Sequence, residues 1–207
     1  MRGWGRAARA CVAALVLSLA GCGDDDDGAT GDSGESTGDS ETEDDSSSGG
    51  GDDVPAIPFC AGVADWSSQA ASLEQEVLAL VNEARAAGYN CTGQSFSPTG
   101  PLTMSPALRC AARVHTQDMV DHNFFDHTNL MGEGPQERID KTGYKWSRWG
   151  ENIAGGNPTA EATVQQWLES SGHCANIMSP EFTEIGVGYV AGGLYGHTWT
   201  QVFGTPL

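Results

Sequence analysis

Hydrophobic residues recur with the period of an amphipathic helix in three long stretches of the chain. Each stretch begins with helix-capping chemistry: Ser72 and Gln75 form a capping-box pattern, and Pro106 and Pro158 can occupy a first helical position. Glycines are expected to end the first and third stretches. The predicted helices are Ser72–Gly88, Ser105–Asn123 and Asn157–Gly172, with a shorter one at Pro135–Lys141.

The C-terminal part of the chain changes to an alternating pattern. Residues 185–189 and 195–203 alternate with a period of two, and Gly192-Gly193 between them is typical of a hairpin turn. Shorter strand-like pieces lie near Leu102 and Trp146. Helices followed by a strand pair predict an α+β fold built in layers.

The N-terminus has the pattern of an export signal. Three arginines precede an apolar run from Ala10 to Ala20, which is too short to span a bilayer stably. The run ends at Leu19-Ala20-Gly21-Cys22, which is typical of a lipoprotein cleavage site. We therefore predict a lipoprotein signal peptide over residues 1–21 and lipid attachment at Cys22. The protein would then be exported and anchored to a membrane, at the cell envelope or surface.

Residues 22–58 are predicted to be a disordered acidic tether. The segment from Gly23 to Asp53 holds thirteen Asp or Glu, but no Lys, Arg or aromatic residue. Such a segment cannot bury enough apolar surface to offset its chain entropy. The signal and the tether carry +3 and −13 of the net charge of −18, which leaves −8 from Cys60 onward. Residues 60–207 suit one domain, and without a basic cluster we expect no nucleic-acid partner.

Four cysteines remain once the signal and Cys22 are set aside, and an even number predicts two disulfides in an exported chain. None shows the C-x-x-C spacing of a thiolate zinc site. The sequence leaves three pairings open. We favour Cys60–Cys91, which brackets the first helix, together with Cys110–Cys174, which would hold the second helix beside His173.

Candidate chemistry concentrates on His127, Glu151 and His173. Two imidazoles and a carboxylate are suitable ligands for zinc or another divalent cation, with open positions left, so these residues are the candidate metal ligands. Glu151 is also the candidate catalytic acid or base, although no nucleophile elbow accompanies it. An alternative of equal weight is that the three side chains only hydrogen-bond to one another and hold loops in place.

The remaining histidines have simpler interpretations. His115 lies on the apolar side of its helix, where a histidine is more often a hydrogen-bonded core residue than a ligand. His122 is expected at the surface. His197 shares a face with Trp199 and Phe203, which favours packing over a role in a groove.

Several short elements, in this order, resemble the CAP superfamily (cysteine-rich secretory, antigen 5, pathogenesis-related 1) in its bacterial branch. They are Gly150-Glu151-Asn152-Ile153-Ala154, Trp167, Ser171–Met178 and Glu184–Gly188. The resemblance implies that residues 60–207 form a CAP (SCP-like) domain, a three-layer α-β-α sandwich. It also implies a central cleft with two His and two Glu, reported in the family to bind divalent metals. The cleft-lining residues would be His115, Trp149, Asn152 and Ser170.

This sequence departs from the family pattern at one position. The second Glu, expected three residues after Trp167, is Ser170, which makes any metal site weaker or wetter. Three functions stay open: an extracellular module that binds a metal, a lipid or sterol, or a cell-wall component; a peptidase-like hydrolase; and a surface adhesion protein with a structural His/Glu network. We favour the first, which is not an enzyme, because no complete catalytic constellation can be assembled.

Overall fold

The computed structural model describes residues 54–207, so the predicted signal peptide, Cys22 and most of the tether lie outside this range. Residues 54–58, assigned above to the tether, belong to the folded part. Val54 and Ile57 pack against the buried Cys60, and a 3₁₀ helix, η1, spans Pro58–Val63. The domain therefore begins before Cys60. Within residues 54–207, no helix is long and apolar enough to cross a membrane.

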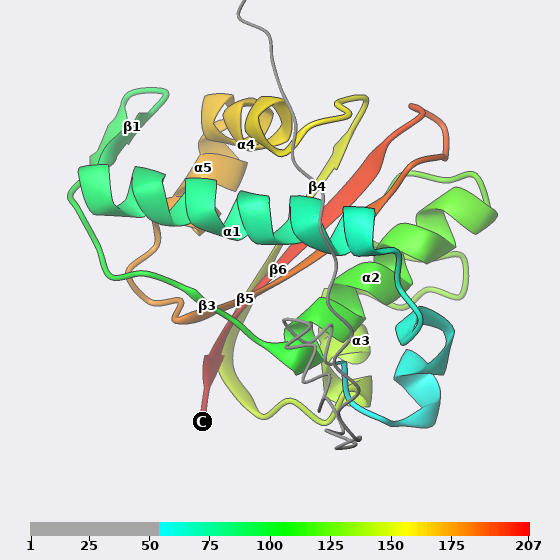
Figure 1. Cartoon of the computed structure of the whole chain (residues 1–207). Helices are drawn as coiled ribbons and strands as arrows, with labels where there is room; N and C mark the ends of the chain where they lie inside the picture. The colour runs from blue at the N-terminus through cyan, green and yellow to red at the C-terminus, as the bar shows by residue number, and fades with distance from the viewer. Residues whose placement is uncertain (1–53) are drawn as a thin grey trace, which may run out of the picture. The chain divides into compact units, whose positions relative to one another are not determined.

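Helices and short strands follow one another along the chain (Figure 1). The helices are α1 (Ser68–Ala87), α2 (Pro106–Asp121), α3 (Pro135–Lys141), α4 (Ala160–Glu169) and α5 (Ser171–Met178). The strands are β1 (Tyr89–Cys91), β2 (Gln94–Phe96), β3 (Thr103–Met104), β4 (Trp146–Gly155), β5 (Glu184–Val190) and β6 (Thr198–Pro206). Strands β1 and β2 form a separate hairpin. The main sheet has the order β3-β5-β6-β4, which leaves β4 at one edge.

Helices cover both faces of the main sheet. Helix α2 lies so close to β5 that a Cβ added at Gly186 would stand 2.0 Å from the backbone carbon of Leu108, so only glycine fits there. Leu108 and Val202 belong to the core on this face. The core on the other face unites residues of α1, α4 and α5, among them Val77 and Trp167. The predicted α+β class and the three-layer α-β-α sandwich are confirmed.

Helix α1 begins earlier than predicted. Its N-cap is Ser67, whose hydroxyl accepts a hydrogen bond from the Ala70 amide at 3.1 Å. Ser72 and Gln75 therefore lie inside the helix. The alanines that follow Ser67 favour helix and are buried, which extends the helix by one turn. Gly88 ends it with a φ of 75°, as predicted.

The third predicted helix is interrupted. The N-cap of α4 is Thr159, so Pro158 lies before the helix and does not occupy its first position as predicted. That helix ends at Glu169, and Ser170 adopts an extended conformation with φ −93° and ψ 122°. Helix α5 then begins at Ser171 and contains Gly172. His173 consequently lies in the first turn of a new helix, and the prediction that Gly172 ends a helix ahead of it was wrong.

Both disulfide pairings predicted above were wrong. The bonds join Cys60 to Cys110 and Cys91 to Cys174. Cys110 lies on α2 and Cys174 on α5, which cover opposite faces of the sheet, so these two cannot meet. Each disulfide belongs to one face. The first ties η1 to α2, and the second ties the β1–β2 hairpin to α5.

Candidate functional site

Glu151 is the centre of a buried polar cluster on the α2 side of the sheet. It lies on β4 opposite Val202 of β6, and only 7% of its surface is exposed. Arg138 of α3 donates from Nη2 to both carboxylate oxygens, at 3.1 and 2.8 Å. The Nδ1 atom of His127 stands 2.8 Å from Glu151 Oε1. Glu151 and His127, predicted to share a site, are therefore in direct contact.

Arg138 is the residue of this cluster that the sequence did not reveal. It is buried, and besides the carboxylate it donates to the backbone carbonyls of Glu133 and His127, both at 2.9 Å. One side chain thus neutralises Glu151 and fastens the loop that carries His127. A buried carboxylate predicts a nearby cation, but nothing in the sequence indicated that a residue of α3 would supply it.

His127 and His115 both lie next to Glu151, but their pKa values shift in opposite directions. The hydrogen bond to Glu151 raises the pKa of His127, whose side chain is 47% exposed. His115 is fully buried; its Nε2 lies 2.9 Å from the Asp126 carbonyl and 3.9 Å from Glu151 Oε1. Burial lowers the pKa of His115 to about 4. His115 is therefore a neutral core histidine at pH 7, as its place on the apolar side of α2 predicted.

His115 should make folding stability fall in mild acid. Its pKa is about 4 when folded and about 6.5 when unfolded, so between these values the unfolded chain binds the additional proton. The free energy of unfolding should drop by about 3 kcal/mol from pH 7 to pH 4 on this account. Urea unfolding at both pH values should show a smaller drop for His115→Gln than for wild type. The exposed His122→Gln should retain the full drop, and an unchanged drop in His115→Gln would contradict this assignment.

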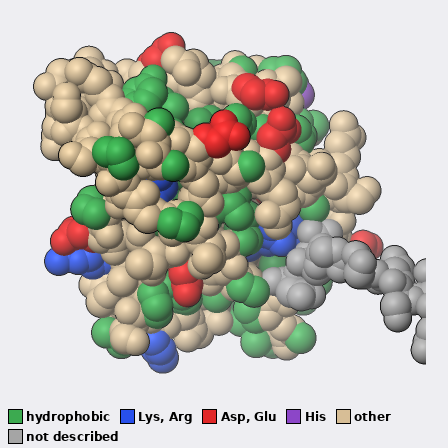
Figure 2. Space-filling model, turned by 60° about the vertical axis from the view of Figure 1, so that its left-hand side comes forward, with side chains coloured by type: hydrophobic (Ala, Val, Ile, Leu, Met, Phe, Trp, Pro, Cys, Tyr) green, Lys and Arg blue, Asp and Glu red, His purple; other side chains and the backbone are tan. Residues whose placement is uncertain are grey.

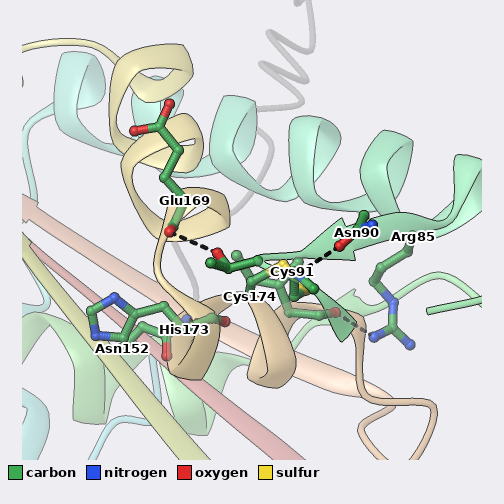
Figure 3. Close-up of a disulfide and its surroundings, with 10 residues drawn as sticks. Arg85, Asn90, Cys91, Asn152, Glu169, His173 and Cys174 are labelled. Carbon is green, nitrogen blue, oxygen red and sulfur yellow. Dashed lines mark hydrogen bonds between the residues drawn. A yellow bond between two sulfur atoms is a disulfide. The ribbon is translucent and has the colours of Figure 1, made fainter. Parts of the chain in front are cut away.

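His173 approaches the cluster from the other face of the sheet. Asn152 follows Glu151 on β4 and so points to the opposite side, where its amide donates to the His173 carbonyl at 3.1 Å (Figure 3). Burial lowers the pKa of His173, and the positive charge of His127 lowers it further. The two histidines thus interact electrostatically around the edge strand. Among residues 54–207, no hydrogen bond joins the His173 side chain to Glu151.

A cavity of about 310 Å³, which we call the cleft pocket, lies beside His173 at the end of β4. Its lining is Phe125, Ile153, Ala154, Gly155, Gln166, His173 and Tyr195. Phe125 and Tyr195 meet edge to face, with ring centroids 5.1 Å apart. The Tyr195 ring also lies directly on Gly155, where an added Cβ would come within 2.6 Å of it. The pocket is walled mainly by apolar groups, with one imidazole and one amide among them.

The other predicted cleft residues lie elsewhere. Trp149 packs with the core around Leu108, and Ser170 forms the break between α4 and α5. Asn152 is fully buried beneath α5, so it positions that helix. His197 stands 2.9 Å from the Tyr189 hydroxyl and also lines a second cavity, so it is not solely a packed residue. None of Trp149, Ser170 or Asn152 belongs to the lining of the cleft pocket in the described part of the chain.

The donor set does not fit a zinc ion held jointly by His127, Glu151 and His173. In residues 54–207, no three His, Cys, Asp or Glu side chains are arranged to hold a metal ion. The Glu151 carboxylate is engaged by Arg138 and His127. Two imidazoles remain, whereas zinc sites in proteins use three or four protein ligands.

Comparison with known proteins identifies the family. The model of the cysteine-rich secretory protein family, CAP, matches residues 78–203, which is more than half of the chain. The chain belongs to this family, as the sequence motifs suggested.

Two bacterial relatives are similar over part of their length. The uncharacterized protein YkwD of Bacillus subtilis (strain 168) is 43% identical over 103 residues, which cover 50% of this chain and 39% of YkwD. The uncharacterized membrane protein YlbC of the same strain is 25% identical over 123 residues, covering 59% of this chain and 33% of YlbC. The chain thus spans less than half the length of these relatives.

Solved structures show the same fold. An extracellular protein containing a SCP domain from Bacillus anthracis str. Ames matches with a TM-score of 0.55 and 25% identity, over 72% of this chain and 44% of that one. An outer surface protein from Borrelia burgdorferi matches with a TM-score of 0.53 and 19% identity, over 66% of this chain and 92% of that one. The CAP-type sandwich is confirmed by these similarities.

Proposed function

We propose that this protein is an exported, non-enzymatic binding module whose cleft pocket takes an amphipathic ligand, a lipid or sterol. The observation that carries the proposal is the commitment of Glu151 to Arg138 and His127, which leaves the imidazoles and the aromatic-walled pocket as the accessible groups. The apolar part of the ligand would contact Phe125 and Tyr195. Its polar or acidic head would lie toward the histidines, where the raised pKa of His127 favours positive charge.

Export and anchoring belong to the same proposal. A similar protein of Bacillus anthracis is described as extracellular, and YlbC is described as a membrane protein. The residues Leu19-Ala20-Gly21-Cys22 support a lipid anchor on Cys22. On the face drawn in Figure 2, Lys and Arg side chains lie apart from one another, which supports a partner other than nucleic acid.

The hydrolase alternative is weaker for a physical reason. A general base must be accessible to the proton that it takes. Glu151 is buried and both of its carboxylate oxygens already contact Arg138, which restricts its access to a substrate proton. This arrangement suits a carboxylate that positions His127.

Ligand binding can be tested with a fluorescent fatty acid and a fluorescent sterol titrated into the full chain. Tyr195→Ala and His173→Ala should each weaken binding about tenfold or more, because each removes a wall of the cleft pocket. His122→Ala changes an exposed histidine outside the pocket and should bind like wild type. Equal binding by all three variants would contradict the site. Ester or peptide turnover abolished by Glu151→Gln would instead favour the hydrolase.

A further inference from the structure

A second cavity, which we call the edge pocket, measures about 540 Å³ and lies at the opposite edge of the sheet from the cleft pocket. Gly155 of β4 and Val190 of β5 both pair with Thr198 of the central strand β6. The two cavities therefore occupy the same end of the sheet, one at each edge. The loop between β5 and β6 separates them, with Tyr195 lining the cleft pocket and His197 lining the edge pocket.

The edge pocket is open because the sheet is incomplete there. Strand β3 pairs only with Glu184 and Ile185 at the start of β5, so the far end of β5 has no neighbouring strand on that side within residues 54–207. The Tyr189 amide is instead satisfied by Glu74 Oε1 of α1, at 3.3 Å. The space beyond Tyr189, between α1, α2 and the η1–α1 connection, forms the cavity. Its volume falls within the roughly 300–1,000 Å³ typical of small-molecule sites.

One wall of the edge pocket is a tryptophan held in a fixed orientation. The Trp66 indole nitrogen donates to Glu74 Oε1 at 2.8 Å. The guanidinium carbon of Arg113 lies 4.9 Å from the centroid of the same ring. These contacts orient the half-buried indole before any ligand arrives, which lowers the entropic cost of binding.

Tyr189 and His197 also line the edge pocket. The Tyr189 ring contacts the buried Trp199 ring, with centroids 4.1 Å apart and planes tilted by 36°, and the His197 ring lies beside its hydroxyl end, with centroids 6.1 Å apart. The Tyr189 hydroxyl is 2.9 Å from His197 Nδ1, which locks the imidazole against the ring. Hydrogen bonds therefore fix the orientation of both Trp66 and His197 in the lining.

The rest of the lining is polar but carries no cation in the described part of the chain. Asp65, Ser67, Gln69 and Gln117 supply carboxylate, hydroxyl and amide groups, and short apolar side chains fill the remainder. The Gln117 amide nitrogen donates to Asp121 Oδ1 at 2.7 Å, which orients this side chain on the surface of α2. Without Lys or Arg, and with Asp65 present, the edge pocket disfavours anionic ligands. Apart from Asp65, its polar side chains offer neutral donors and acceptors.

We propose that the edge pocket is a binding site for a neutral saccharide. The oriented aromatic side chains Trp66 and Tyr189 in the lining can contact the C–H faces of a sugar ring, and amide, hydroxyl and imidazole groups match its hydroxyls. The site is separate from the cleft pocket and does not depend on the function proposed for it.

The test is a titration of the ¹⁵N-labelled full chain with neutral disaccharides, cellobiose and N,N′-diacetylchitobiose, followed by amide chemical shifts. At least one sugar should give saturable shifts at Gln69, Gln117 and Val190. Gln117→Ala, which alters only a partly exposed helix face, should weaken binding about fivefold, and Trp66→Ala about tenfold or more. The matched control is Tyr195→Ala in the cleft pocket, which should bind within twofold of wild type.

Other results would overturn the proposal. One is the absence of any saturable shift up to about 50 mM sugar, a concentration far above the roughly millimolar range of weak sites. The others are shifts confined to the cleft pocket, or full affinity in Gln117→Ala. Tighter binding of glucuronic acid than of glucose would contradict the inference that the edge pocket disfavours anionic ligands. Trp66→Phe, which keeps an aromatic face but lacks the indole N–H, should retain more affinity than Trp66→Ala.

Discussion

Replacing Arg138 with alanine should lower the free energy of unfolding by about 3–5 kcal/mol, the usual cost of removing one partner of a buried ion pair. Both side chains are almost fully buried, at 2% and 1% exposure, so Glu151 would lose its cation without gaining water. The loop carbonyls of Glu133 and His127 would lose a donor as well. Urea unfolding at pH 7 measures this loss.

A second Arg–Glu pair of similar length provides the control. Arg148 Nη2 lies 3.0 Å from Glu181 Oε1, but the two side chains are 57% and 53% exposed. Arg148→Ala should therefore cost less than about 1 kcal/mol. Adding Glu151→Gln to Arg138→Ala should recover part of the loss, because the unpaired charge is removed. A loss in Arg138→Ala as small as that in Arg148→Ala would mean that Glu151 is solvated, and would reopen its role as a base.

The layered fold followed from local patterns. The stripe through Val77 and Val81 was sufficient to predict α1, since an amphipathic face of that length must pack on something. Helix α3 matched its predicted bounds, Pro135–Lys141, because Pro at its start and Gly143 after its end mark both termini in the sequence. The alternation in residues 185–189 likewise predicted β5. These signals depend on residues that are close together in the sequence, so the sequence alone is sufficient to detect them.

The candidate site depended on contacts that no local pattern encodes. Glu151 and Asn152 are neighbours in the chain, yet they face opposite sides of β4 and serve different helices. The sequence motif joins Glu151 with His173 as if they shared one surface. Their placement on either side of an edge strand could be predicted only once the position of β4 in the sheet was known.

The disulfide error also has a geometric origin. Helix α1 separates Cys60 from Cys91, and a 20-residue helix is about 30 Å long. Disulfide-bonded Cα atoms lie within about 7 Å of each other, so cysteines at the two ends of a straight helix cannot pair. Cys60 precedes the helix by several residues, however, so the helix length alone does not exclude Cys60–Cys91; the pairing follows from the packing of η1 against α2. Once Cys60 pairs with Cys110, Cys91 and Cys174 are left to pair with each other, because the four cysteines pair among themselves.

The second large effect is expected from the Cys91–Cys174 disulfide. Replacing both cysteines with alanine should lower the free energy of unfolding by about 2–5 kcal/mol, because the bond closes a segment with a sequence separation of 83. Both residues are buried, and the bond holds the first turn of α5 against the β1–β2 hairpin (Figure 3). Non-reducing peptide mapping of the wild type should recover this pair and Cys60–Cys110.

The region that loses hydrogen-exchange protection distinguishes the effect of this bond from that of the other disulfide. Arg85 still holds the far end of α5 through the carbonyls of Ile177 and Ser179, at 2.7 and 2.8 Å. The variant should therefore lose amide hydrogen-exchange protection first in the turn that carries His173. The matched variant Cys60→Ala/Cys110→Ala should lose a similar free energy, since its sequence separation is 50, but keep protection in α5 because its bond lies on the other face. Equal loss of α5 protection in both variants would contradict the assignment of one disulfide to each face. Unchanged protection in Cys91→Ala/Cys174→Ala would show that Arg85 and Asn152 position His173 without the disulfide.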